Sequence, residues 1–502
     1  MTLIRRVANS PNALFWLTTL AMYFGWSLVT ACLSGNLPYD HIEMLIWGKS
    51  WQLSYWKHPP LPAWATEAVS LATNRAIWPQ FFLGPATTAT AAWVVWRASR
   101  DVAGPWRALI AALSLQGCIY YNYECDLFNH NTIQLPLVAG LIWAGWRAVR
   151  GSRETGNTSL AWICFGACSA VAIYGKHTAG FAPVGVLAFT LINKDSRWLW
   201  RTRGPYLGLL TGTIVMVPHL IGLWQVDFLP FHSAFLYDTA PAPWWGRITY
   251  PLEFVGVQIA MMFGVWIMMF LLFAVPGTPT IEHESPAIET RKAALYFLWC
   301  TAFPVALAAL LSCVLNLYMH RFWAMGWLPY TGLVVLLFVR RPIGFSGLRT
   351  MWIAWCVLAF GILGFVAVRL IARPHITGNV AAVCFNGDQF AAQVGARWSK
   401  ATGGAPLTIV IGTHWIAGNV AVYHSDHPDV IIDAIPLRAP WVDLKRIETE
   451  GAVLVWEEPM PPLWLDNFGS HTPIERFEIT PRTTADVPKK ALSMSIILPA
   501  GK

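Results

Sequence analysis

A series of long apolar runs constrains this chain more than any other feature of its sequence. About eleven runs of roughly 17 to 25 residues recur, each long enough to cross the ~30 Å hydrocarbon core of a bilayer as a helix. They cover residues 12–33, 77–96, 105–121, 131–149, 159–174, 178–193, 205–224, 252–275, 294–315, 323–339 and 350–370. The chain is 55% hydrophobic and only 12% charged, which agrees with this pattern. The sequence therefore predicts a polytopic membrane protein. Its first span is expected to stay as a helix, because no small-residue cleavage pattern follows it.

Lys and Arg are distributed unequally between alternate loops, which predicts the orientation in the membrane. With a cytoplasmic amino terminus, the inside segments hold 17 of these residues: Arg5, Arg6, Arg97, Arg100, Arg107, Arg147, Arg150, Arg153, Lys194, Arg197, Arg201, Arg203, Arg291, Lys292, Arg340, Arg341 and Arg349. The outside loops hold 6: Lys49, Lys57, Arg75, Lys176, Arg247 and Arg321. An odd number of spans then places the carboxyl terminus outside. The net charge of +8 follows from this topology and indicates no nucleic-acid partner.

The composition changes after about residue 374, which predicts a second domain. Short segments typical of strands lie among polar and Pro-rich connections: LTIVIG, NVAVYH, DVIID, AVLVW and MSIILP. We therefore expect an all-α transmembrane domain over residues 1–373, with a first outer loop at 34–76. A small extracytoplasmic α/β domain is expected over residues 374–502.

Ionisable residues gather in the segments predicted to face outward. The first outer loop contains YDHIEMLIWGKSWQLSYWKHPPLPAW at residues 39–64, and other groups follow on the same side: Glu124, Asp126, Lys176, His177, His219, Asp227, His320 and Arg321. Outer loops must hold polar groups, and Trp and Tyr anchor membrane interfaces, so many of these residues need no catalytic role. We interpret Glu67 and Asp238 in that way. Any chemistry is expected on the outer face.

Asp40 and Glu43 form the most suggestive pair in the first outer loop. Three residues apart on a helical turn, their carboxylates point the same way. Two carboxylates near a membrane surface cost desolvation energy unless cations or hydroxyls meet them. The pair therefore suggests a general base. A divalent metal ion held by Asp40, Glu43 and a His, His58 being the nearest choice, is an open alternative, and no cofactor is certain.

Several elements in a fixed order resemble the GT-C fold glycosyltransferases that use polyprenyl-phosphate donors. YWKHPPLPAW resembles their first outer loop, FNHNTIQLPL the start of their fourth span, YGKHTAGFAPVGVL a Lys-bearing turn, and HRFWAMGWLPY an Arg-aromatic-Pro element. HWIAGNVAVYHSDHPDV looks like a segment of the outer domain of bacterial members. The most similar groups are the protein O-mannosyltransferase, aminoarabinose transferase and lipopolysaccharide-core galacturonosyltransferase families.

The resemblance implies a function. The chain would transfer a sugar from a polyprenyl-phosphate donor to a lipid, glycan or protein acceptor, with inversion. It would lie among the lipids of a bacterial inner (plasma) membrane, with a periplasmic carboxyl-terminal domain. Asp40 would be the base, with Glu43 beside it. The donor phosphate would meet Lys57 or His58, Lys176 and Arg321, since Arg binds as a fork and Lys as a point charge. Tyr55, Asp126 and His320 would bind substrate.

The departures from the family pattern leave alternatives open. Many relatives have an adjacent acidic pair, or an Asp followed by Arg and Tyr, whereas this chain has Asp40-His41-Ile42-Glu43. Either Glu43 or His41 therefore fills the second role. Relatives often place Lys directly before the Pro pair, where this chain has His58. Asp126 could orient hydroxyl groups or cap the helix that follows.

A membrane transporter or lipid-linked-sugar flippase is the main rival interpretation. An ion path would place charges within several spans, whereas here they lie at the outer ends of the spans. That favours an enzyme facing the membrane surface. A noncatalytic scaffold that displays the outer domain would not need the Asp40 pair.

Overall fold

The computed structural model describes residues 10–154, 158–236, 243–275, 287–339, 341–459, 461–468 and 470–500. Arg5, Arg6, Asp238 and Arg340 from the sequence analysis lie outside these residues. Internal contacts divide the chain into two compact units. Unit 1 comprises residues 1–28, 82–221 and 231–365, and unit 2 comprises residues 29–81, 222–230 and 366–502.

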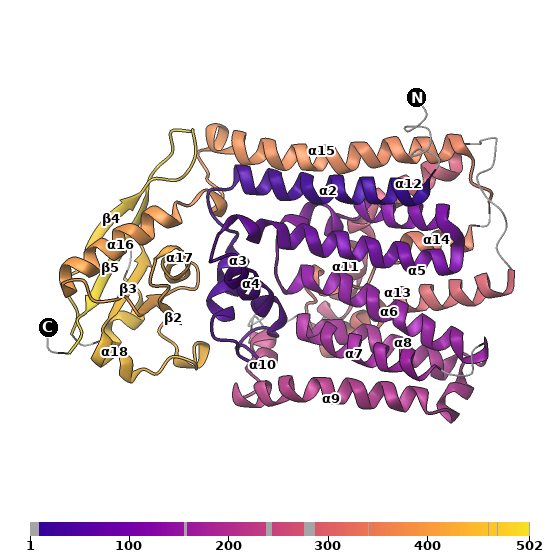
Figure 1. Ribbon diagram of the computed structural model, residues 1–502, viewed down its shortest axis with the longest axis horizontal. Helices are drawn as coiled ribbons and strands as arrows, with labels where there is room; N and C mark the ends of the chain where they lie inside the picture. The colour runs from indigo at the N-terminus through magenta and orange to yellow at the C-terminus, as the bar shows by residue number, and fades with distance from the viewer. Residues whose placement is uncertain are drawn as a thin grey trace. The chain divides into compact units, whose positions relative to one another are not determined.

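Unit 1 is helical. Its helices are α5 (Leu83–Ser114), α6 (His130–Glu154), α7 (Ser159–Gly175), α8 (Phe181–Ile192), α11 (Gly246–Met261), α12 (Phe263–Ala274), α13 (Ala287–Leu315) and α14 (Thr331–Phe338). Four helices belong to it in part: α2 (Pro11–Leu33), α9 (Gly204–Gln225), α10 (Leu229–Leu236) and α15 (Phe345–Thr377). Figure 1 shows α5, α6 and α7 lying along one another. Helices suit an apolar environment because they satisfy their backbone polar groups internally.

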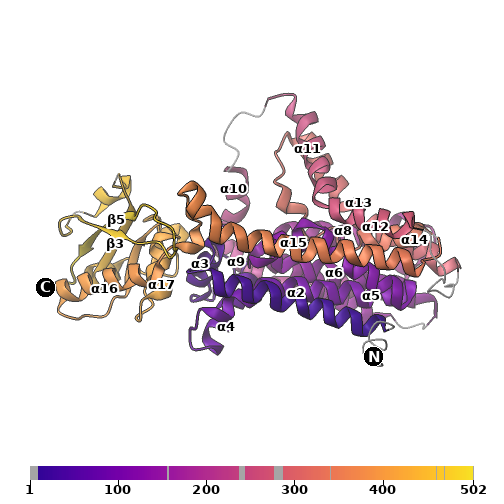
Figure 2. The same cartoon turned by 90° about the horizontal axis from the view of Figure 1, so that it is seen from above.

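The predicted count of about eleven spans is not confirmed. Among the described residues, 4 helices are long and apolar enough to cross a membrane: Pro11–Leu33, Gly204–Gln225, Arg291–Leu315 and Phe345–Thr377. Two bent pairs raise the number to 6, one broken by 93° between Gly117 and Ile119 and one by 51° between α11 and α12. Figure 2 shows α11 running obliquely to α12. Other predicted spans, such as 159–174 and 178–193, correspond to apolar helices that are shorter.

A glycine separates two of the predicted spans. Spans 77–96 and 105–121 both fall largely on α5, whose backbone is non-helical at Gly104 (φ 81°, ψ 172°). Gly accepts a positive φ at no steric cost, and Pro105 has no N–H to continue the helix. The sequence pair Gly-Pro therefore interrupts a segment of 32 residues.

Unit 2 contains the first outer loop and a mixed sheet. The loop forms α3 (Tyr39–Gly48) and α4 (Leu61–Ala72). The sheet has the order β2-β1-β3-β5-β4, with β1 parallel to β2 and β3, and β5 antiparallel to β3 and β4. The other elements are β1 (Ile409–Gly412), β2 (Asp429–Ile432), β3 (Ala452–Glu457), β4 (Glu475–Ile479), β5 (Lys490–Ile497), α16 (Gly387–Thr402), α17 (Ile416–Tyr423) and α18 (Lys445–Glu450). The small carboxyl-terminal domain with a sheet is therefore confirmed.

Alternate residues of the central strands build the core of this domain. Ile409 and Ile411 of β1 pack with Leu454 and Trp456 of β3 in one buried cluster. The period of two along a strand places these side chains on the same face of the sheet. Ile447 of α18 packs against that cluster. Val410 and Val455, the residues between them in sequence, are equally buried. Both faces of the central strands are therefore covered.

One predicted strand is wrong. NVAVYH, residues 419–424, lies almost entirely in helix α17. Thr413 Oγ1 accepts a hydrogen bond from the Ile416 N–H at 3.1 Å, which satisfies a donor of the first helical turn. A short apolar run is compatible with either element, and periodicity alone does not separate them. The edge strand β4 was not predicted, because only two residues of ERFEI, Phe477 and Ile479, are apolar.

Candidate active site

Helix α3 carries Asp40 and Glu43, the two carboxylates that their spacing in the sequence predicted to lie on one helical face. The helix begins after Pro38, whose extended backbone (ψ 157°) turns the chain into the first helical turn. Asp40 lies in that turn and is half-buried, whereas Glu43, one turn later, is only 1% exposed. Lys57 Nζ lies 3.4 Å from both carboxylate oxygens of Glu43. The first outer loop therefore holds a buried carboxylate that is paired with a cation.

The environment of Glu43 raises its pKa. Burial raises the pKa of Glu43 to about 7, the Lys57 charge opposes this, and the Asp40 charge adds to it. Glu43 therefore changes its charge near neutral pH. The negative charge of Asp40 is one cause of the raised pKa of Glu43, so the two carboxylates interact electrostatically across one turn of α3.

His41 and Glu43 were the alternatives for the second role beside Asp40, and their surroundings in the structure differ. His41 is 2% exposed, and its ring Nε2 lies 3.0 Å from Gln80 Oε1. Burial lowers the pKa of His41 to about 4, so its ring is neutral at physiological pH. A neutral imidazole bonded to Gln80 cannot pair with a cation, whereas Glu43 does. This geometry favours Glu43.

Tyr55 and His58 differ in how far they are buried. Tyr55 is fully buried, its ring stacks on Trp47 at 5.1 Å, and its hydroxyl donates to the Trp47 carbonyl at 2.7 Å. This arrangement favours a packing role. His58 is half-buried, and its ring lies 6.2 Å from that of Trp47. Of the two basic residues before the Pro pair, only Lys57 forms an ion pair with Glu43 in the described structure.

Unit 1 brings two of the predicted phosphate-binding segments together. Lys176, which follows α7, is 7% exposed, and its Nζ donates to Asn131 Oδ1 and, at 2.9 Å, to the carbonyl of Phe322. Phe322 belongs to the short helix η7 (Arg321–Ala324), which begins with the predicted arginine. Lys176 is therefore directly beside the Arg321 segment, although 145 positions separate them in sequence.

Arg321 presents its side chain outward from a firmly held backbone. Its carbonyl accepts hydrogen bonds from Tyr120 Oη at 2.9 Å and Gln258 Nε2 at 3.3 Å. Its guanidinium lies 4.7 Å from the Phe322 ring centre and 3.9 Å from Glu124 Oε1, and the side chain is 48% exposed. The fork of Arg321 is therefore available to a ligand. Sequence reasoning did not select Tyr120 or Gln258, because their roles depend on contacts distant in the chain.

Asp126 and His320 flank this cluster. Asp126 ends the short helix η4 (Tyr123–Asp126), four positions before α6 begins at His130. The cap of the α6 amino terminus comes from Asn129, whose Oδ1 accepts from the N–H groups of Asn131 at 2.7 Å and Thr132 at 3.2 Å. The exposed His320 caps η7, since its Nδ1 accepts from the Phe322 N–H at 3.5 Å.

No group of three His, Cys, Asp or Glu side chains among the described residues is arranged to hold a metal ion. The metal alternative at Asp40, Glu43 and His58 therefore gains no support from the described structure and stays a prediction.

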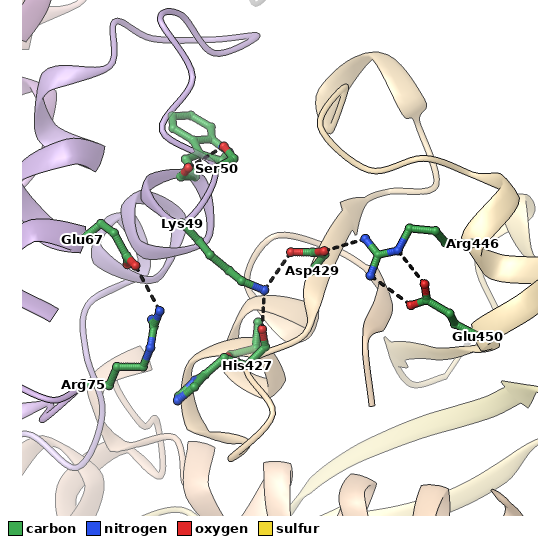
Figure 3. Close-up of polar contacts among 10 residues, drawn as sticks. Lys49, Ser50, Glu67, Arg75, His427, Asp429, Arg446 and Glu450 are labelled. Carbon is green, nitrogen blue, oxygen red and sulfur yellow. Dashed lines mark hydrogen bonds and ion pairs between the residues drawn. The ribbon is translucent and has the colours of Figure 1, made fainter. Parts of the chain in front are cut away.

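A pocket in unit 2 is lined in part by α3, through Leu45 and Ile46, but by none of the predicted site residues. Its volume is about 30 Å³, room for roughly one or two waters, and Glu67, Arg75, Lys49 and His427 contribute to its lining. Glu67, which we expected to be solvated, is 2% exposed and pairs with Arg75 Nη2 at 3.1 Å (Figure 3). Its second carboxylate oxygen is buried without a described partner. A pocket of this volume is too small to hold a sugar.

Comparison with known proteins supports the predicted resemblance. Residues 57–222 match the family described as dolichyl-phosphate-mannose-protein mannosyltransferase. The structure resembles that of ArnT from Cupriavidus metallidurans bound to undecaprenyl phosphate, with a TM-score of 0.55 and 14% identity over 96% of this chain and 97% of that chain. The chain has the ArnT fold. ArnT in the apo state gives a TM-score of 0.50 with the same identity and coverage.

The oligosaccharyltransferase of Archaeoglobus fulgidus in the apo form gives a TM-score of 0.46 and 11% identity, over 89% of this chain and 69% of that chain. No curated protein sequence matches the chain. The ArnT-like architecture, helical with a small carboxyl-terminal sheet domain, confirms the fold that the motifs predicted.

Proposed function

We propose that this chain is an integral membrane glycosyltransferase that takes a sugar from a polyprenyl-phosphate donor. The observation that carries the proposal is the buried Glu43 paired with Lys57 at 3.4 Å, one turn from Asp40 on the same helix. A buried carboxylate whose pKa is raised by burial and which has a specific charge partner is a candidate functional group. The family match over residues 57–222 and the fold of ArnT, which was solved with undecaprenyl phosphate bound, support the same proposal.

The reaction displaces a phosphate from the anomeric carbon of the donor sugar. The departing phosphate must be neutralised, and the incoming hydroxyl must lose a proton to become a good nucleophile. Asp40 takes that proton, because it is the more exposed of the two carboxylates and can reach an acceptor. A single displacement of this kind inverts the anomeric centre.

Glu43 acts through Lys57 rather than on the substrate. At 1% exposure it cannot reach an acceptor hydroxyl, but both of its oxygens face Lys57 Nζ. The Lys57 side chain is 21% exposed and carries three donors, so it can keep its bond to Glu43 and present another to a phosphate oxygen. Glu43 is therefore a positioning residue for the cation.

Lys176 and Arg321 supply further positive charge for the phosphate. Burial lowers the pKa of Lys176 to about 7, so it supplies a point charge in its protonated form, which a phosphate would favour. The half-exposed Arg321 provides a permanently charged fork that matches two phosphate oxygens. Asp126 and His320 beside them orient hydroxyl groups of the substrates. The acceptor is a lipid, a glycan or a protein, and the reaction takes place on the outer face of a bacterial inner membrane with the carboxyl-terminal domain in the periplasm.

The test is reconstitution of the purified chain in liposomes with a panel of radiolabelled polyprenyl-phosphate sugars and a panel of lipid, glycan and protein acceptors. We expect loss of label from one donor with release of polyprenyl phosphate, and no such release when Lys57 is replaced by Met. Movement of an intact labelled lipid between leaflets, without release of polyprenyl phosphate from any donor, would refute the proposal and indicate a flippase.

A further inference from the structure

Helix α17 of the carboxyl-terminal domain holds α3 at its amino-terminal end. Asn36, which precedes α3 and is 1% exposed, donates from Nδ2 to Asn419 Oδ1 at 2.7 Å. The Leu37 N–H donates to the Tyr423 hydroxyl at 3.3 Å, and that hydroxyl donates to Asn36 Oδ1. Tyr39 stacks on Trp415 with ring centres 5.2 Å apart. The residues just before Asp40 are therefore fixed by the α17 segment.

An ionic chain holds the other end of α3. Lys49, directly after the helix, donates to Asp429 Oδ1 at 2.8 Å and to the His427 carbonyl at 2.6 Å. Arg446 joins Asp429 to Glu450, with distances of 2.9 and 3.0 Å (Figure 3). Both ends of the ten-residue helix α3 are thus tied to the carboxyl-terminal domain.

Between these ends, α3 approaches α17 at a residue without a side chain. A Cβ added at Gly418 would lie 2.6 Å from Ile42 Cγ2 and 3.5 Å from Ile46 Cγ2. A separation of 2.6 Å is well inside van der Waals contact. Ile42 is fully buried and β-branched, so its Cγ2 cannot turn away without moving the helix. Ile42 lies between Asp40 and Glu43 in sequence.

We propose that Gly418 is a positioning residue, and that through it the carboxyl-terminal domain sets the place of Asp40 and Glu43. The inference rests on the proposed function, because it assigns the catalytic carboxylate to α3. A displacement of the order of 1 Å at a reacting group costs about 10²-fold in rate. The domain after residue 366 therefore acts in the reaction through α3.

The variant that tests this is Gly418→Ala. We expect kcat to fall by about 10²-fold while KM for the donor changes little, and the unfolding midpoint to fall modestly because the added methyl overpacks the contact with Ile42. Gly256→Ala on α11 is the matched control, since a Cβ there meets no atom within 4 Å. Adding Ile42→Leu should restore kcat, because Leu has no Cγ2 on its β-carbon and conserves volume. Ile42→Leu alone should behave like the parent protein.

Hydrogen exchange across Tyr39–Gly48 separates this inference from the proposed function. Faster exchange in Gly418→Ala, reversed by Ile42→Leu, is expected even if the parent protein transfers no sugar, a result that would refute only the proposed function. Parent-like kcat and exchange in Gly418→Ala would overturn the inference. If Gly418→Ala does not fold, Tyr423→Phe tests the inference instead. It removes one hydroxyl and should lower kcat by about 10-fold at unchanged KM, and a parent-like kcat would overturn the inference as well.

Discussion

Replacing Lys57 with Met should raise the pKa of Glu43 and change how stability depends on pH. Two unit charges about 4 Å apart interact by about 4 kcal/mol at an effective dielectric constant of about 20, and a cation this close shifts a carboxyl pKa by about 1 to 3 units. Lys57 Nζ lies 3.4 Å from both oxygens of Glu43, and neither side chain is more than 21% exposed. Without Lys57, the pKa of Glu43 should therefore rise by about 1 to 3 units from its value of about 7.

The sign follows from the proton balance between folded and unfolded chains. The pKa of Glu43 is raised from 4.5 to about 7 on folding, so between these values the folded state binds more protons. The contribution of Glu43 to the free energy of unfolding is fully present below about pH 4.5 and is lost as the pH rises through about 7. The total loss is about 3 kcal/mol. In Lys57→Met the loss should continue to higher pH.

The assay is the thermal unfolding midpoint, followed by Trp fluorescence in detergent from pH 5 to 9. The parent protein, Lys57→Met, Glu43→Gln and the double variant are compared at each pH. Because Gln does not titrate, the difference between each protein and its Gln counterpart isolates Glu43. Identical pH dependence of that difference with and without Lys57 would refute the reasoning that the two side chains form a pair.

Three other predictions concern the rest of the chain. Arg321→Lys keeps the charge but loses the fork, so the donor concentration needed for half-maximal transfer should rise while the protein stays folded, and parent-like transfer by Arg321→Ala would reduce Arg321 to an interfacial anchor. Arg75→Ala leaves the buried Glu67 without its partner and should lower the free energy of unfolding by about 1 to 3 kcal/mol. Arg97→Ala, at the more exposed pair with Asp101, should lower it by less than about 1 kcal/mol. Equal losses for the two variants in denaturant titrations would contradict this prediction. A topology reporter fused after residue 502 should be active outside the cytoplasm, and one within residues 276–293 inside; a cytoplasmic carboxyl terminus would place the proposed site on the wrong face.

Local pattern was enough to predict the elements whose signal lies within a few residues. The run at 12–33 became α2 (Pro11–Leu33), and DVIID and AVLVW became β2 and β3. The spacing of Asp40 and Glu43 placed both on one helix because helical neighbours are three or four positions apart. The strand prediction for residues 419–424 failed, because a helix that is buried on most sides has no polar face to reveal its period.

Contacts between distant segments could not be read from the sequence. Glu67 looked like a loop carboxylate until α4 placed it beside Arg75 in the interior of unit 2. Tyr55 stood in a motif that suggested substrate binding, but its hydroxyl bonds the Trp47 carbonyl. The bond from Lys176 to the Phe322 carbonyl depends on tertiary packing across unit 1. The predicted site residues shared a plausible chemistry, and only the fold determined which partner each one has.

Single-turnover transfer by Asp40→Asn tests the central claim most directly. The variant and the parent protein are loaded with a labelled donor that the parent protein uses, binding is measured first, and transfer is then started with acceptor. Asp40→Asn should bind donor as the parent protein does and transfer about 10² to 10⁴ times more slowly, the loss typical of removing a general base. Glu43→Gln should instead weaken donor binding through Lys57, with a smaller loss of transfer from the bound state. Transfer by Asp40→Asn at the parent rate would contradict the account.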